Sequence, residues 1–158
     1  MIESIQDFPA GLPPLFQWLG IMVAGAIPFV ESYAGSVIGV VAGLALPVAV
    51  GAAVAGNIVS MSALVLGTSA VRDKVRADRA REESPKRRRL RTAFDKYGVA
   101  GVSLVGQTIL PSQITSAAMV SFGASRNAVL FWQTLSIILW GVAFGLLATF
   151  GVDVLGVG

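Results

Sequence analysis

Glu31 is the only acidic residue in a long uncharged stretch of the sequence. Between Phe8 and Val71 there is no Asp, Lys, Arg or His, and Glu31 stands three residues after Pro28. A carboxylate inside a membrane is costly unless it is neutralised, paired or hydrated, so it marks a functional site by default. Proline also denies a helix one backbone hydrogen bond, and in a membrane the freed groups must meet protein or water. Glu31 is therefore predicted to bind an ion or substrate beside a polar cavity.

Three interpretations of Glu31 follow from its position. It binds a proton or cation during transport, or it is a structural residue that stays neutral or pairs with Arg126 or a helix amino terminus, or it lies in water at the membrane interface. We favour the first, in which neighbouring residues complete the binding site. These are Pro28, Ser32 and Tyr33.

A second group of polar but uncharged residues surrounds another proline in the apolar sequence. The group comprises Gln107, Thr108, Pro111, Ser112 and Gln113. Backbone carbonyls freed by a helix break bind cations, and amide groups at a helix amino terminus bind anions. This group is therefore a candidate neutral counterpart of the Glu31 site. The alternative is that these side chains only satisfy the broken backbone of their own segment.

The residue types present argue against enzymatic and metal chemistry. There are no histidines and no cysteines among the 158 residues, so the commonest general base and the usual thiolate and imidazole metal ligands are missing. The apolar segments hold no pair of acids, and no glycine loop has the spacing of a phosphate-binding motif. We therefore expect no catalytic residue, no metal site and no cofactor.

Composition and charge distribution predict an integral membrane protein. The chain is 54% hydrophobic and only 13% charged, which is too apolar for an ordinary soluble domain. Eleven of the twelve basic residues and five of the nine acidic ones lie in 72–96, which gives this segment a net charge of +6. A basic segment between apolar halves is cytoplasmic by the positive-inside rule, so we expect a multi-pass protein of the cell (plasma) membrane. Because topology explains these charges, no nucleic-acid partner is expected.

The apolar segments and prolines divide the chain, a single membrane domain over 1–158, into two similar halves. The first repeat, 15–71, contains a helical hairpin over 15–44, broken near Pro28, and a transmembrane helix over 48–71. The connector covers 72–96. The second repeat, 97–150, contains a hairpin broken at Pro111 and a transmembrane helix over 127–150. A single kinked span over 15–44 is the alternative to the first hairpin.

The length of the hairpin arms predicts how they meet the membrane. An arm of about 13 residues is roughly 20 Å long as a helix, too short to cross a hydrocarbon core of ~30 Å. The hairpins are therefore expected to be re-entrant. The first transmembrane helix runs into the cytoplasm and the second runs out of it, so the two halves have opposite topology. The predicted fold is therefore an all-α inverted repeat of two re-entrant hairpins, each followed by a transmembrane helix.

Small residues recur at a spacing of four after Glu31. They include Gly35, Gly39, Gly43 and Gly51. Small residues at this spacing let helices approach closely in lipid, so we interpret them as helix-packing residues. Asn57 is a buried amide candidate that would bridge neighbouring helices. The alternative is that the row lines a path leading away from Glu31.

Several short motifs resemble those of a known family. They are Gly25-Ala26-Ile27-Pro28, Gly56-Asn57, Lys96-Tyr97-Gly98 and Leu110-Pro111. With the basic loop, they resemble the small multi-drug export proteins, a family similar to the wider DedA (VTT, SNARE-associated) superfamily. Pro111, Gly123, Phe131 and Trp140 also resemble the second half of DedA proteins, so the resemblance covers about residues 18–150. It implies paired re-entrant hairpins and either drug export or the translocation of lipid phosphates.

These observations predict a small secondary transporter that couples protons at Glu31 to the export of cationic or amphipathic small molecules, acting as a homodimer. One acid, with no base except Arg126 at the membrane rim, favours cations over phosphates. The alternatives are a DedA-like translocase or scramblase for polyprenyl-phosphate or phospholipid, and a non-transporting structural membrane protein. The expected partners are membrane lipid, a small-molecule or lipid substrate, and protons or another cation.

Overall fold

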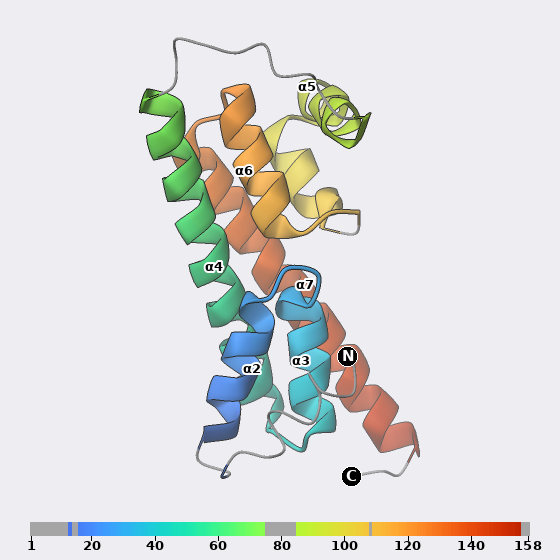
Figure 1. Cartoon of the computed structure of the whole chain (residues 1–158). Helices are drawn as coiled ribbons and strands as arrows, with labels where there is room; N and C mark the ends of the chain where they lie inside the picture. Colours follow the sequence, from blue (N-terminus) through green and yellow to red (C-terminus); the bar gives the residue numbers. More distant parts are fainter. Residues whose placement is uncertain (1–12, 14–15, 75–84, 108, 156–158) are drawn as a thin grey trace. The chain divides into compact units, whose positions relative to one another are not determined.

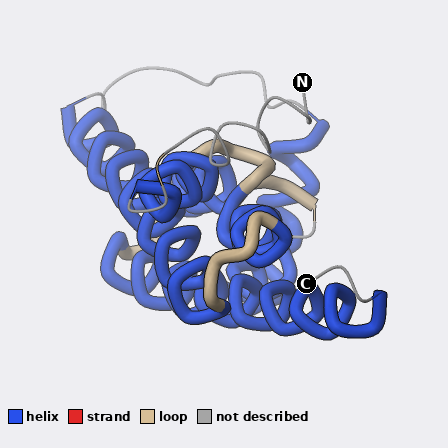
Figure 2. Tube along the Cα trace, turned by 90° about the horizontal axis from the view of Figure 1, so that it is seen from below, coloured by secondary structure: helices blue, strands red, loops and turns tan. Residues whose placement is uncertain are grey.

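The computed structural model describes residue 13 and residues 16–74, 85–107 and 109–155. All regular secondary structure in these residues is helical, as Figure 2 shows. The helices are α2 (Gln17–Ala26), α3 (Glu31–Val41), α4 (Leu46–Lys74), α5 (Pro85–Gly106), α6 (Ser112–Phe122) and α7 (Arg126–Leu155). The predicted all-α class is therefore confirmed for the described residues.

The chain forms two compact units, and the two long helices contribute to both. Unit 1 comprises residues 1–60 and 137–158, which include α2, α3, the first half of α4 and the second half of α7. Unit 2 comprises residues 61–136, which include the rest of α4, α5, α6 and the start of α7. Each unit therefore contains two shorter helices and part of each long helix.

In unit 1, α2 and α3 form a helical hairpin, seen side by side in Figure 1. A Cβ atom on Gly35 would lie 3.4 Å from the Cα atom of Gly25, so these two glycines contact each other. Residues ten apart in one continuous helix are separated by about 15 Å. The chain therefore folds back between Ala26 and Glu31, and the alternative of a single kinked helix over 15–44 is not adopted.

Gly43 ends α3 and lets the chain turn into α4. Its φ of 86° is in the left-handed region that glycine adopts at low cost. The amide of Leu44 donates to the carbonyl of Gly39 at 3.0 Å, and that of Gly43 to Val40 at 2.9 Å, which is the Schellman pattern of a helix end. Pro47 then occupies the first turn of α4, where its missing N–H costs little.

The core of unit 1 is made of small residues that bring helices together. Ile21, Ala52 and Ala53 are its buried centre. A Cβ on Gly25 would lie 2.8 Å from the Cα of Ala53, and a Cβ on Gly56 would overlap the carbonyl oxygen of Met22. The α2–α4 interface therefore depends on backbone-to-backbone contact at glycine, a common form of helix packing in lipid.

The helices α4 and α7 match the predicted transmembrane segments. Their apolar portions, Leu46–Ala70 and Arg126–Val154, have 25 and 29 residues. At ~1.5 Å per residue they are about 38 and 44 Å long, enough to cross a hydrocarbon core of ~30 Å with tilt. Both are therefore long and apolar enough to cross a membrane, a criterion of length and composition alone.

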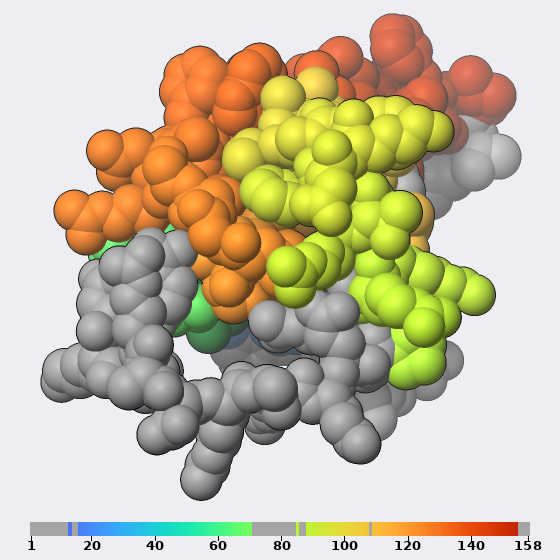
Figure 3. All heavy atoms as spheres, turned by 90° about the horizontal axis from the view of Figure 1, so that it is seen from above, coloured from blue at the N-terminus to red at the C-terminus, as the bar shows by residue number. Residues whose placement is uncertain are grey.

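In unit 2, α5 differs from the predicted hairpin arm. Helical structure begins at Pro85, inside the predicted connector, and is interrupted at Gly98, whose φ is 67° and ψ −171°. The arm that precedes the break at Pro111 is therefore the short segment 99–106. α5 as a whole packs with α6, and Figure 3 shows α5 (yellow-green) at the surface. Residues 75–84, which belong to the predicted connector, lie outside the described residues.

Candidate functional site

The break between α2 and α3 has an unusual backbone. The amides of Val30 and Glu31 both donate to the carbonyl of Ile27, each at 3.1 Å. Phe29 and Glu31 have φ angles of 73° and 55°. Non-glycine residues in this left-handed region carry a conformational cost of roughly 1–3 kcal/mol each, and such residues cluster at functional sites. Two of them within three residues make this break a candidate site on backbone geometry alone.

The side chain of Glu31 is completely buried, with a relative exposure of 0%. Its neighbours Pro28 and Phe29 are exposed, so the turn directs the acidic side chain, and not the apolar ones, into the protein. Residues 1–60 and 137–158, which make up unit 1, contain no Lys, Arg or His. A buried carboxylate is costly unless it is paired, protonated or bound to a cation.

Ser32 holds the first turn of α3 against α7. It is fully buried, and its hydroxyl donates to the carbonyl of Ile137 at 2.8 Å. One turn further along α7, a Cβ on Gly141 would lie 3.2 Å from the Cβ of Ser32. The close approach of the two helices therefore depends on a glycine in α7 and a small residue in α3.

Tyr33 supports the break from the outside. Its hydroxyl donates at 3.0 Å to the carbonyl of Phe29, one of the two residues with a positive φ. Its ring packs on that of Phe144 with centroids 5.6 Å apart. Phe144 in turn contacts Trp140 at 5.8 Å. Tyr33 therefore acts on the turn that carries Glu31 through its hydroxyl, while its ring belongs to an aromatic cluster on α7.

The predicted helix-packing residues have different surroundings. Gly35 contacts Gly25, and a Cβ on Gly39 would lie 2.6 Å from the Cβ of Ala49. In contrast, Gly43 and Gly51 have open space where a Cβ would be. The glycines spaced by four therefore do not lie on one continuous packing surface, because the chain turns at Gly43. Asn57 is fully buried in α4.

The second predicted group belongs to unit 2, where its described members are all buried. Gln107 accepts a hydrogen bond through Oε1 from the hydroxyl of Ser136 in α7, at 2.8 Å. Ser112 and Gln113 begin α6 directly after Pro111, and the Ser112 hydroxyl lies 3.4 Å from the Gln113 Oε1 atom. Thr108, the remaining member, lies outside the described residues.

Unit 2 contains further buried polar side chains that were absent from the predicted site. Ser103 lies on α5, one turn before Gln107, which directly follows that helix, and Gln133 lies one turn before Ser136 on α7. All four residues are 5% exposed or less. Within the described part of the chain, Ser103 Oγ, Gln107 Nε2 and both amide atoms of Gln133 have no hydrogen-bond partner. In the sequence, these residues could have been found as polar residues spaced by three or four within apolar segments, a spacing that places them on one face of a helix.

Replacing Gln133 by Met should stabilise the protein by about 1 kcal/mol, because a buried amide without partners costs roughly 1–3 kcal/mol. Replacing Gln107 by Met should have the opposite effect, since it removes the bond with Ser136. Thermal unfolding in detergent, followed by circular dichroism, measures both changes. A lower melting temperature for Gln133→Met would show that this amide holds a bound water or ligand.

The second halves of the two hairpins share a pattern of residues 80 positions apart. Ser32 and Ser36 in α3 correspond to Ser112 and Ser116 in α6. In each pair the second hydroxyl donates to the carbonyl of the first residue at 2.6 Å. The sequence pattern Ser-x3-Ser-x6-Gly, present in both halves, was the signal that could have revealed this correspondence.

The glycines that end these two helices continue the same correspondence. Gly123 lies 80 residues after Gly43 and also has a positive φ, 113° compared with 86°. After each glycine, the next amide donates to a helix carbonyl five residues back at 3.0 Å, Leu44 to Gly39 and Ala124 to Met119. The long helices α4 and α7 begin two residues later, at Leu46 and Arg126. Local backbone geometry is therefore repeated from α3 into α4 and from α6 into α7.

Among the described residues, no three acidic side chains come together to form a metal site. Each unit thus has its own candidate site: in unit 1 a strained break with one buried acid, and in unit 2 buried amide and hydroxyl side chains. Comparison with known proteins finds no matching family model, no matching curated protein and no matching solved structure.

Proposed function

We propose that this protein is a small secondary transporter that exports cationic or amphipathic small molecules in exchange for protons bound at Glu31. The observation that carries the proposal is the complete burial of Glu31 at a strained helix break. A buried carboxyl group at a helix break is suited to bind and release a proton, because its charged form is costly when it is removed from water.

Membrane insertion is the first part of this proposal, with α4 and α7 crossing the plasma membrane. Only 22% of the most apolar window of α7 and 44% of that of α4 is buried. Phe131, Leu147 and Phe150 on α7 are each more than 60% exposed. A core helix of a soluble protein would bury such side chains, because exposing a large apolar side chain to water costs about 1.5–3 kcal/mol. Lipid around α7 removes this cost.

The second part of the proposal is an inverted repeat with two re-entrant hairpins. The support comes from the shared Ser-x3-Ser-x6-Gly geometry and from the short helices that precede each long one. In transporters built from inverted repeats, substrates bind at broken helices near the middle of the membrane. The break at Pro28 and the break at Pro111 are then the two candidate substrate-facing positions.

Flux measurements in proteoliposomes test the proposed activity. The purified protein, reconstituted with a pH-sensitive dye inside the vesicles, should release protons when a lipophilic phosphonium cation is added. A parallel assay with a fluorescent phospholipid tests the translocase alternative. Cation-dependent proton movement supports the antiporter, whereas lipid movement without it would replace the proposal by a lipid translocase.

Cysteine labelling tests the proposed topology, and the natural chain has no cysteine to interfere. A cysteine at Ser84, in the basic connector, should react with an impermeant maleimide only from the cytoplasmic side. A cysteine at Asp153, which is exposed near the end of α7, should react only from outside. Labelling of both positions from the same side contradicts a single membrane crossing by α7.

A further inference from the structure

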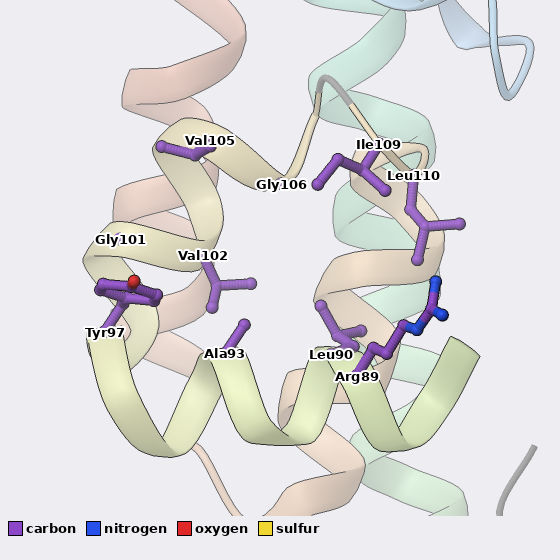
Figure 4. A pocket seen from close by; sticks show the side chains of 10 residues that line it. All are labelled: Arg89, Leu90, Ala93, Tyr97, Gly101, Val102, Val105, Gly106, Ile109 and Leu110. Atoms are coloured by element: carbon purple, nitrogen blue, oxygen red, sulfur yellow. The ribbon is translucent and has the colours of Figure 1, made fainter. Parts of the chain in front are cut away.

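Unit 2 has a cavity of about 650 Å³ between the two parts of α5 and the turn that follows it. This volume is within the range of roughly 300–1,000 Å³ typical of small-molecule sites. As Figure 4 shows, one wall is the first part of α5 and the opposite wall comes from its second part and from residues 109 and 110. The walls are formed by aliphatic side chains: Leu90, Ala93, Val102, Val105, Ile109 and Leu110.

Gly98 gives this cavity its shape. At Gly98 the left-handed backbone (φ 67°) interrupts α5, so that its two parts diverge and enclose a space. Glycine adopts this backbone conformation at low cost. Gly101, which also lines the cavity, lies close to Tyr97, where an added Cβ would lie 2.6 Å from the tyrosine Cβ.

Polar groups are confined to the edge of this cavity. Among its lining side chains, only Arg89 and Tyr97 carry polar atoms. Both residues are exposed, and Figure 4 shows the guanidinium of Arg89 at the end of the cavity near Leu110. The nearby Arg91 packs over the ring of Phe122 at 5.7 Å, and Lys96 lies over the ring of Tyr97 at 4.9 Å. Arg89 is thus the cation placed at the cavity itself.

We propose that this cavity binds one acyl chain of an anionic phospholipid, with the headgroup phosphate held by Arg89. Aliphatic walls match a hydrocarbon chain, and a guanidinium binds a phosphate through two parallel hydrogen bonds. The ligand is therefore an amphipathic anion. The cavity lies beside a basic segment, and anionic lipids gather at basic segments next to a membrane.

This inference rests on the proposed membrane location but not on transport. The lipid is a bound ligand of unit 2 and is distinct from the exported molecule. By binding in the cavity, it holds the first part of α5 at the membrane interface. Leu90, Ala93 and the ring of Tyr97 all face the cavity on one side of that segment, as in a helix that lies along a lipid surface.

Lipid binding to the delipidated full-length protein in detergent, measured by native mass spectrometry, tests the proposal. Phosphatidylglycerol and phosphatidylcholine with the same acyl chains, and glycerol phosphate without chains, are the three probes. Phosphatidylglycerol should bind most tightly. Phosphatidylcholine should bind about tenfold more weakly, because its headgroup has no net negative charge to complement Arg89. Glycerol phosphate should not bind. Binding of glycerol phosphate as tightly as the lipid would replace the acyl-chain site by a simple anion site.

Two pairs of variants locate the bound lipid. Ala93→Phe fills the cavity and should weaken the binding of both lipids at least tenfold, whereas Thr92→Phe, on an exposed neighbouring position outside the cavity, should not. Arg89→Gln should remove the preference for phosphatidylglycerol, whereas Arg88→Gln should retain it. Equal binding by Ala93→Phe and Thr92→Phe would show that the lipid binds elsewhere on the surface, and the proposal would be wrong.

A further variant separates this inference from the proposed transport. Glu31→Gln should bind phosphatidylglycerol like the natural protein, because Glu31 belongs to unit 1 and the cavity to unit 2. Normal lipid binding without cation flux in the natural protein would refute the transporter alone. Normal flux without lipid binding would refute the lipid site alone.

Discussion

Glu31→Gln should reduce proton-coupled cation flux to the level of vesicles without protein. Glutamine keeps the size and hydrogen-bonding capacity of the side chain but cannot exchange a proton. Glu31 is the only titratable acid buried in the described residues, so no neighbouring carboxyl group is available to replace it. Flux in proteoliposomes, normalised to the amount of reconstituted protein, measures the change.

Asp153→Asn is the matched control for Glu31→Gln. It removes the other described acid of unit 1, which is exposed at the end of α7, and flux should stay within twofold of the natural protein. Unchanged flux in Glu31→Gln would contradict the role assigned to this residue. If Glu31→Gln instead melts at a much lower temperature than Asp153→Asn, Glu31 is a structural residue, and the non-transporting alternative is favoured.

Gly56→Ala should lower the free energy of unfolding by at least about 1–3 kcal/mol, which is the usual cost of inserting a methyl group into a closely packed site. The added Cβ would overlap the carbonyl oxygen of Met22 in α2 and lie 3.2 Å from the amide nitrogen of Ala26. Both obstacles are backbone atoms, so no side-chain rotation relieves the overlap. The hairpin would have to move away from α4, and thermal unfolding in detergent should report a large decrease in melting temperature.

Gly51→Ala provides the comparison within the same helix. A Cβ at Gly51 meets open space, and alanine is favoured over glycine inside a helix by roughly 0.5–1 kcal/mol. This variant should therefore be as stable as the natural protein or more so. Equal melting temperatures for Gly51→Ala and Gly56→Ala would show that α2 does not approach α4 as closely as described.

The sequence was sufficient to predict α4, α7 and the break between α2 and α3, because the relevant signals are local. The long apolar stretches predicted α4 and α7 within a few residues of their ends, since a long uninterrupted apolar run is typical of a single helix. Pro28 predicted the break that separates α2 from α3. The structure favours a folded-back hairpin over one kinked helix, because Gly25 and Gly35 contact each other.

Other features depended on residues that are distant in the sequence. The row of small residues after Glu31 predicted one packing surface, but the left-handed turn at Gly43 divides it, so that Gly51 faces open space. Gly98 appeared within an uninterrupted apolar arm, yet its backbone divides α5 and forms the wall of a cavity. A glycine's role is decided by its φ angle and by its neighbours in space, and neither is visible in hydropathy.

What the sequence determined by itself is the all-helical class, the positions of the long helices and the choice of Glu31 as the residue most in need of explanation. Charge and hydropathy are properties of each residue, so they can be read from the sequence alone. Only the tertiary structure decided that the carboxyl group is buried on a strained turn, that Ser32 donates to the carbonyl of Ile137, 105 residues away, and that Gln107 accepts from Ser136. Burial and contact are properties of pairs of segments, because water is excluded only when two surfaces meet.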